Sequence, residues 1–188
     1  SAGAITLIMQ AMLWPLLFAD EASQVTLHGG THVPFSPPYH YLEHVFLPAA
    51  GRFGAQVDLR LDAWGWLPAG EGQISAMIQP LHHLQAVSFE PMARDVVQGV
   101  AAVTNLPSHI AQRMANRAAN RLRQEGIQPL IQPVRERGAG PGAGIFLWLP
   151  QAGFGALGRK GYPSDAVADD AVADVLSFIE NGLSLIHI

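Results

Sequence analysis

The chain has 188 residues, of which 49% are hydrophobic and 14% are charged. At ~150 residues per domain, this length allows one or two domains, and the composition excludes a disordered chain. The 19 glycines and 14 prolines follow no period, which excludes a collagen-like repeat. The chain contains no cysteine, which excludes disulfide scaffolds, thiolate nucleophiles and iron–sulfur clusters. The lack of cysteine also fits a reducing compartment, and we expect a cytoplasmic location.

Both ends of the chain are apolar. The sequence opens at Ser1 and enters an apolar stretch from Ala4 to Ala19. This stretch has no basic segment before it and contains Gln10 and Pro15, so we expect neither a signal peptide nor a membrane span. Residues 183–188 at the other end are also mostly apolar, and we expect the chain to be a fragment of a longer protein.

Charge is distributed unevenly along the chain. Residues 1–100 hold three arginines and eight acidic residues, whereas residues 101–160 hold eight basic and two acidic residues. Residues 161–188 hold five acidic residues and no basic ones. The basic middle block favours either a surface that faces a polyanion or a solvated helix face.

The first half of the chain predicts a layered α+β domain. Apolar spacing predicts a buried helix over 4–19, whose expected inner face carries Ile5, Ile8, Met12 and Leu16. A strand over 23–28, an amphipathic helix over 39–53, and strands over 56–62 and 73–79 follow. This order is typical of an α+β fold and not of a regular βαβ winding.

A second module is expected beyond a boundary near Met92 to Arg94. The sequence predicts a strand over 95–103 and a helix from Ser108 to Glu125, capped by Pro107-Ser108. The remaining expected elements are a strand over 127–134, a hairpin over 139–144, a strand over 145–149 and a helix over 165–180 capped by Ser164. Strand, helix, strand, strand, helix makes a compact second domain.

Two histidine pairs have a spacing that some zinc sites use. His28 and His32 are four residues apart, and so are His40 and His44, which we expect on one helix face. Neither pair lies in a metalloprotease signature, so surface or core-edge histidines are favoured over a metal site. We assign no metal ligand and no catalytic residue.

Two other features invite a functional interpretation. Gly29-Gly30-Thr31 precedes a proline-fixed loop over 34–38, which loses little entropy when it binds a ligand. Arg113, Arg117 and Arg121 recur every four residues and form a basic stripe on the predicted helix. This stripe either contacts phosphate groups or is a solvated helix face, and both interpretations stay open.

Taken in order, several segments resemble the RNA 3′-terminal phosphate cyclase family. They are Ser1-Ala2-Gly3 with Gln10, His28-Gly-Gly-Thr-His-Val-Pro-Phe-Ser-Pro-Pro38, Gly65-Trp-Leu-Pro-Ala-Gly-Glu-Gly72, Asn105-Leu-Pro-Ser-His-Ile-Ala-Gln-Arg113 and Gly140-Pro-Gly142. The resemblance implies repeated α/β units of a large domain over 1–94, followed by a smaller inserted α/β domain over 95–182. Residues 183–188 depart from the family pattern.

The resemblance implies an ATP-dependent reaction on RNA that needs a divalent cation, Mg²⁺ or Mn²⁺. A histidine takes AMP from ATP and releases pyrophosphate, and AMP then passes to the RNA 3′-phosphate. The neighbouring 2′-hydroxyl displaces AMP to give a 2′,3′-cyclic phosphodiester, so one difficult step becomes several easier ones. The expected partners are ATP and RNA with a 3′-terminal phosphate, with no membrane partner.

By the same resemblance, Gln10 matches an ATP-contacting glutamine, and Pro37 matches a proline that lines the adenine site. Phe154, in an expected Gly-Phe-Gly turn, matches an aromatic residue that stacks on adenine. The family's nucleophilic histidine segment is not found, and His187 lacks its context. Trp66 and Glu71 also replace residues that are usually Phe or Tyr and Gly.

Two alternatives to the enzyme stay open. One is a catalytically inactive cyclase-like protein that acts as a binding factor in ribosomal RNA processing. The other, a carboxyvinyl transferase of related fold, lacks its basic substrate-site signatures here. Retention of Gln10 and of the Pro37 loop favours the enzyme, although residues 1–188 alone are expected to be inactive.

Overall fold

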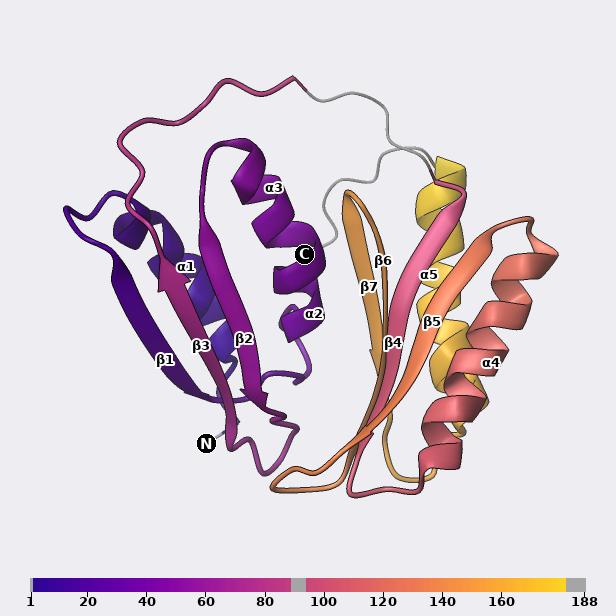
Figure 1. Cartoon of the computed structure of the whole chain (residues 1–188). Helices are drawn as coiled ribbons and strands as arrows, with labels where there is room; N and C mark the ends of the chain where they lie inside the picture. The colour runs from indigo at the N-terminus through magenta and orange to yellow at the C-terminus, as the bar shows by residue number, and fades with distance from the viewer. Residues whose placement is uncertain (1, 89–93, 182–188) are drawn as a thin grey trace. The chain divides into compact units, whose positions relative to one another are not determined.

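A computed structural model describes residues 2–88 and 94–181 (Figure 1). Contacts divide the chain into two compact units, Ser1–Pro91 with Glu136–Gly142 (unit 1) and Met92–Arg135 with Ala143–Ile188 (unit 2). The expected boundary at Met92 and Ala93 and the tail over 183–188 lie outside the described residues. That these units are a large domain and an insert stays a prediction.

Unit 1 combines one three-stranded sheet with two helical segments. Its elements are α1 (Ile5–Leu17), β1 (Ser23–Gly29), α2 (Tyr39–Tyr41), the π-helix η1 (Leu42–Phe46), α3 (Leu47–Arg52), β2 (Val57–Ala63) and β3 (Gly72–Ile78). The strand order is β1-β3-β2, and the central β3 is antiparallel to both neighbours. The α+β class predicted from the sequence is confirmed.

Alternation along the strands places the core on one face of this sheet. Ile74, Ala76 and Ile78 of β3 are buried and pack with apolar residues of α1 and of the α2–α3 segment. The intervening positions of β1 and β2 are exposed and mostly polar, such as Gln24, Asp58 and Arg60. This pattern is typical of an antiparallel sheet that has one face toward solvent.

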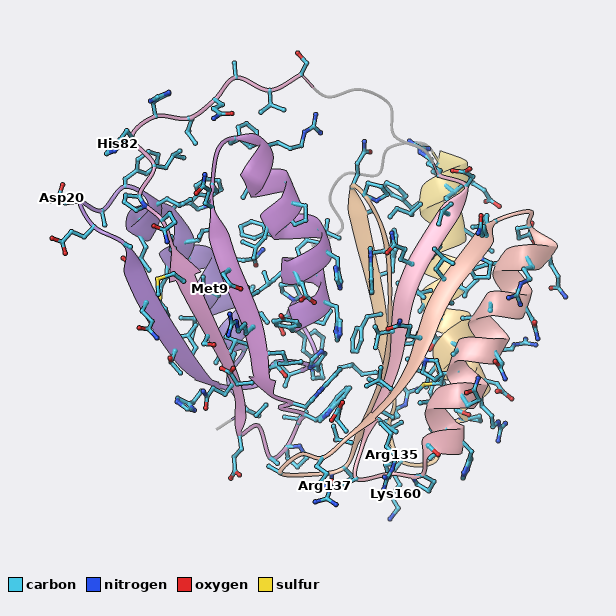
Figure 2. All side chains as sticks on the ribbon, in the orientation of Figure 1. Met9, Asp20, His82, Arg135, Arg137 and Lys160 are labelled. Atoms are coloured by element: carbon cyan, nitrogen blue, oxygen red, sulfur yellow. The ribbon has the colours of Figure 1, made fainter. Side chains whose placement is uncertain are left out.

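The buried face of α1 differs from the predicted one. Ile5, Met9, Leu13 and Leu17 are the residues that face the core, and Met9 is labelled in Figure 2. Ile8, which was predicted to face the core, is 46% exposed. Leu7 is also 46% exposed, and Phe18, which follows the helix, is 52% exposed. The helix is apolar on every side, so its sequence period could not select the side that the sheet covers.

A widened turn interrupts the helix predicted over 39–53. The chain is helical from Tyr39 to Arg52, but Leu42–Phe46 is a π-helix. Pro48 lies two residues beyond its end and has no N–H to donate to the His44 carbonyl, so the regular α-helical bond is lost there. Such turns are rare, and many of them lie at functional sites.

Unit 2 has a four-stranded sheet and two long helices. Its elements are β4 (Val96–Thr104), α4 (Ser108–Gln124), β5 (Gln128–Glu136), β6 (Gly142–Leu149), β7 (Ala152–Leu157) and α5 (Ser164–Asn181). The strand order is β5-β4-β6-β7, and β7 pairs antiparallel with β6. Figure 1 shows α4 and α5 on the same side of this sheet.

Small residues allow α4 and α5 to pack closely. Ala111, Ala115 and Ala118 of α4 are buried in one cluster with Ala168 and Ala171 of α5. Inward side chains of β4 and β6, such as Val103 and Leu147, complete this core. The same close approach brings the polar edges of the two helices within reach of each other.

Two sequence predictions for unit 2 are wrong. The predicted Gly-Phe-Gly turn is part of strand β7, whose glycines do not break the strand because it pairs with β6 from Leu149 to Gly144. Ser108 forms no capping hydrogen bond, since Pro107 occupies the N-cap position of α4. The expected order of strands and helices therefore lacked one strand.

Candidate functional site

The loop that follows β1 is attached to the beginning of α1. The Gly30 N–H donates to the Gly3 carbonyl at 2.7 Å, and the Ile5 N–H donates to the Gly30 carbonyl at 3.1 Å. A Cβ atom at Gly30 would lie 2.8 Å from the Ala2 carbonyl oxygen, so only glycine allows this approach. The segment that carries Gln10 and the loop that carries Pro37 are therefore joined where each begins.

The same loop is also fixed to the chain around Gly65. The Thr31 and His32 N–H groups both donate to the Gly65 carbonyl at 3.0 Å, and the Gly65 N–H donates to Thr31 Oγ1 at 2.9 Å. A Cβ at Gly65 would collide with Gly72 N at 2.6 Å. The two glycine motifs of the sequence, 28–38 and 65–72, therefore form one hydrogen-bonded substructure.

Two buried histidines, His32 in this loop and His40 in α2, are hydrogen-bonded to each other. His32 Nε2 lies 3.1 Å from His40 Nδ1, and the two residues are 1% and 6% exposed. His32 Nδ1 lies 2.7 Å from Thr31 Oγ1, whereas the Gly65 carbonyl is 3.4 Å from that hydroxyl. The Thr31 hydroxyl donates to the Gly65 carbonyl, so His32 Nδ1 donates to that hydroxyl and His32 Nε2 accepts from His40 Nδ1.

Two tryptophans enclose this histidine pair. The His32 ring stacks on Trp64 at 4.4 Å and on Trp66 at 5.0 Å between centroids. The backbone at Gly142 lies against the Trp66 ring, which explains why Glu136–Gly142 belongs to unit 1. The hairpin predicted over 139–144 does not form, because its flanking strands β5 and β6 lie on either side of β4. Gly142 instead contacts the Trp66 side of the cluster.

The environment keeps both buried histidines neutral. Burial, followed by the neighbouring His40, holds the pKa of His32 well below its usual value. Burial also lowers the pKa of His40 to about 4, against the opposing charge of Glu43. Neutral rings fit the chain of single hydrogen bonds, because each ring then has one donor and one acceptor nitrogen.

A charged group lies at the outer edge of the cluster. Glu43 Oε2 is 3.1 Å from His44 Nε2, and the Tyr39 hydroxyl donates to Glu43 Oε1 at 3.0 Å. Partial burial opposes ionisation of Glu43, but hydrogen bonds from His44 and Tyr39 and the charge of His44 lower its pKa overall. Burial and then the charge of Glu43 raise the pKa of the Tyr39 hydroxyl.

A cavity of about 320 Å³ lies beside this edge, lined by Glu43, Leu47, Pro48, Ala55, Val57, Asp58 and Leu59. Its polar side chains are the carboxylates of Glu43 and Asp58. Since a nucleoside triphosphate is itself strongly negative, these carboxylates disfavour the cavity as a nucleotide site. Neither Gln10 nor Pro37 lines it.

The two predicted site residues lie on adjoining segments of unit 1. Gln10 is half-buried on α1, and Pro37 is half-buried in the loop that begins at Gly30. The backbone bonds at Gly30 join these segments, but they do not test whether either residue contacts a nucleotide. Both assignments stay predictions.

Phe154 and the arginine stripe have structural partners. The Phe154 ring packs on Phe178 at 5.5 Å between centroids, beside the core of unit 2. Arg117 forms a two-point ion pair with Asp169 at 2.8 Å, and Arg121 reaches the same carboxylate at 3.3 Å. Arg113 pairs with Asp165 at 2.8 Å. All three arginines of the stripe are therefore paired, by two aspartates of α5.

The described residues hold no group of three or more His, Asp or Glu side chains that could bind a metal ion. Of the predicted histidine pairs, His28 is exposed on β1 while His32 is buried, so that pair does not converge. His40 and His44 do share a face, with ring centroids 6.2 Å apart. No helix in the described ranges is long and apolar enough to cross a membrane.

Sequence analysis did not foresee that His32, His40 and Trp64 form one cluster. The available signal was the eight-residue separation of two histidines across a proline loop, which alone does not specify a contact. The close packing of Gly65 against Gly72 was equally hidden, although the glycine-rich motif marked the region.

The fold and the site define an α+β protein in which a glycine–proline loop is fixed beside the first helix. Over residues 1–179 the chain matches the family described as RNA 3′-terminal phosphate cyclase, and it belongs to that family. It is 49% identical over 183 residues to the RNA 3′-terminal phosphate cyclase of Gloeothece citriformis, covering 95% of this chain and 52% of that protein.

More distant relatives carry the same name. The chain is 40% identical over 193 residues to the protein of Methylococcus capsulatus, covering 98% of this chain and 53% of the relative. It is 37% identical over 171 residues to the protein of Archaeoglobus fulgidus, covering 91% of this chain and 52% of that relative. The chain therefore spans about half the length of the curated relatives that it matches.

Proposed function

We propose that this chain is part of an ATP-dependent enzyme that converts an RNA 3′-terminal phosphate into a 2′,3′-cyclic phosphodiester. Membership of the family and the names of the relatives support this reaction. ATP and RNA with a 3′-terminal phosphate are the proposed partners, and the cytoplasm is the proposed location. The contribution of this chain is to hold the nucleotide.

One observation carries the proposal. The loop over 30–38 is fixed by backbone hydrogen bonds both to Gly3 beside α1 and to Gly65. A loop fixed at two points loses little entropy on binding, which is the property a nucleotide-lining loop needs. Pro37 would then line the adenine pocket, and the Gln10 amide would supply a directed hydrogen bond.

The proposed chemistry passes through a histidine–AMP intermediate. A histidine nitrogen attacks the α-phosphorus, its bond to AMP forms, and pyrophosphate leaves. An oxygen of the RNA 3′-phosphate then attacks the AMP phosphorus, and the histidine–phosphorus bond breaks. The 2′-hydroxyl oxygen attacks the 3′-phosphorus and loses its proton to a base, and AMP leaves. His32 and His40 cannot begin this sequence, because both are buried and hydrogen-bonded. We assign the nucleophile to none of the described histidines.

The divalent cation, Mg²⁺ or Mn²⁺, is proposed to arrive with the ATP phosphates. The described side chains do not form a cluster suited to hold such an ion by themselves. No step is therefore assigned to a protein-bound metal.

A second candidate stays open, because the nucleophile is assigned to none of the described histidines. This candidate is a catalytically inactive cyclase-like protein that binds RNA during ribosomal RNA processing. Both candidates require RNA binding, but only the enzyme requires ATP binding at Gln10 and Pro37. ATP affinity therefore separates them.

The test measures ATP binding to the 188-residue chain by calorimetry. Gln10→Ala should weaken ATP binding about 5- to 30-fold, since one lost polar contact in a binding site is worth roughly 1–2 kcal/mol. Gln24→Ala is the matched control, because Gln24 is an exposed glutamine on β1, on the sheet face away from α1. Equal ATP affinity of the two variants would exclude Gln10 from the site.

A further inference from the structure

Phe35 has an unusual conformation at the tip of the fixed loop. Its side chain is 103% exposed, as open as in an extended peptide. Its backbone φ is 61°, in the left-handed region that bulky residues rarely adopt. An apolar ring is thus held in solvent by a backbone that a smaller residue would adopt more easily.

The surrounding loop holds this conformation. The Ser36 hydroxyl donates to the Val33 carbonyl at 3.0 Å, and the Tyr39 N–H donates to the Thr31 carbonyl at 3.0 Å. Pro34 and Pro37 restrict the backbone on either side of Phe35. The backbone that carries Phe35 is therefore restrained on both sides.

A fully exposed aromatic ring on a strained, restrained backbone points to a ligand. Strained residues persist where the structure over-determines them, and they concentrate at ligand-binding sites. Its flat apolar face fits the π-face of a nucleobase, which stacks on aromatic side chains without regard to sequence. Phe35 is also two residues from Pro37, on the same fixed loop.

We propose that Phe35 is a stacking platform for a nucleobase, and this inference rests on the proposed function. The base is either the adenine of ATP or the terminal base of the RNA. Each source supplies the same planar aromatic surface. The ring touches the base only, so it positions the nucleotide and takes no part in bond formation.

The experiment pairs protein variants with ligands that lack the base. Wild-type chain, Phe35→Ala and Phe35→Trp are titrated with a single-stranded RNA bearing a 3′-terminal phosphate, and with the same RNA whose last nucleotide is abasic. The second arm compares ATP with inorganic tripolyphosphate. Phe18→Ala is the matched control, since Phe18 is 52% exposed on α1 and lies outside the loop.

Phe35→Ala should weaken binding of one intact ligand about 5- to 100-fold, the usual effect of removing one stacked base contact. Binding of the ligand without the base should not change, and Phe35→Trp should retain the affinity of wild type. The ligand pair in which the affinity loss requires the base identifies that base as belonging to RNA or to ATP. Phe18→Ala should bind as wild type does.

Other results would overturn the inference in distinguishable ways. If the wild-type chain binds intact RNA and ATP but Phe35→Ala matches Phe18→Ala, the platform is wrong while the proposed function stands. If the wild-type chain binds neither ligand, both fail. If Phe35→Ala lost the same affinity for intact and for base-free ligands, Phe35 would act only through the structure of the loop. Phe35→Gly, which suits the positive φ, keeps the test valid if the alanine variant folds poorly.

Discussion

The most constrained residues of unit 1 are His32 and His40. Each is buried, and when neutral it has one donor and one acceptor nitrogen, so protonation of either ring would place a charge in a desolvated site. Because Thr31 and His32 also fix the loop to Gly65, the state of the histidine pair is linked to the loop. Acid should therefore destabilise unit 1.

The predicted pH dependence follows from the pKa of His40. Its folded-state pKa is about 4, whereas an unfolded histidine has about 6.5, so the unfolded state binds more protons between these values. The free energy of unfolding should fall as pH decreases below about 6.5, by up to about 3 kcal/mol near pH 4. The lowered pKa of His32 acts in the same direction. Urea unfolding at several pH values measures this slope.

A glutamine replacement isolates the histidine contribution. His40→Gln keeps a hydrogen-bonding side chain but cannot titrate, so its unfolding free energy should vary less between pH 6.5 and 4.5 than that of wild type. His82→Gln removes an exposed histidine outside the cluster, labelled in Figure 2, and is the control. Parallel pH profiles for wild type and His40→Gln would contradict a neutral buried His40.

At the scale of elements, α4 and α5 show why charge spacing alone left the role of the arginine stripe open. Arg113, Arg117 and Arg121 of α4 recur every four residues, which also suits a phosphate-binding stripe. The partners lie about fifty positions further along the chain, where Asp165 and Asp169 follow the same spacing on α5. Only the packing of the two helices brings the patterns together.

Arg117 is expected to contribute little to RNA binding. Its guanidinium is engaged at two points by Asp169, so Arg117→Ala should leave the slope of log affinity against log salt unchanged. A true phosphate contact would lower that slope by about 0.7 on single-stranded RNA. Filter binding at several salt concentrations measures the slope.

Two further variants sharpen this measurement. Asp169→Asn should release Arg117 and Arg121 and thereby increase salt-dependent RNA affinity. Arg123→Ala is the matched control on the same helix, since Arg123 donates to the neutral amide of Asn120. A reduced slope in Arg117→Ala but not in Arg123→Ala would restore the phosphate-binding interpretation.

The sequence was sufficient for most elements because local patterns determine them. Alternation located β1, β2 and β3 within one or two residues, and apolar spacing located α4 and α5. The π-turn at Leu42–Phe46, strand β7 and the buried face of α1 were missed. Strand β7 depends on pairing with β6, and the buried face of α1 depends on which side meets the sheet, neither of which a short window records. The π-turn has a local signal in Pro48, which lies inside the helix predicted over 39–53.

The candidate site was predictable only in part for a similar reason. Glycine and proline motifs identified the two loops, since such residues mark close backbone approaches. The pairing of Thr31 with Gly65 and of His32 with His40 needs the folded topology. The strained backbone of Phe35 has no signature in the sequence.

At the scale of the whole molecule, the 188-residue chain is predicted to form no covalent adduct with AMP. Nucleotidyl transfer needs a nucleophile in line with the α-phosphate and cations that stabilise the developing charge. The chain has no cysteine, and its single lysine, Lys160, is exposed in the turn that follows β7. His32 and His40 are buried, as described above, and His28 lies on the solvent face of β1.

Incubation with α-labelled ATP and Mg²⁺, followed by denaturing electrophoresis, measures the adduct. The same preparation should bind ATP in calorimetry, which shows that a missing label reflects missing chemistry and not a missing site. His187 lies outside the described residues, so His187→Ala serves as the comparison variant. An acid-labile labelled band in the wild-type chain that disappears in His187→Ala would contradict the prediction. It would also identify His187 as the nucleophile, because a phosphoramidate bond is formed only by a nitrogen that reached the α-phosphate.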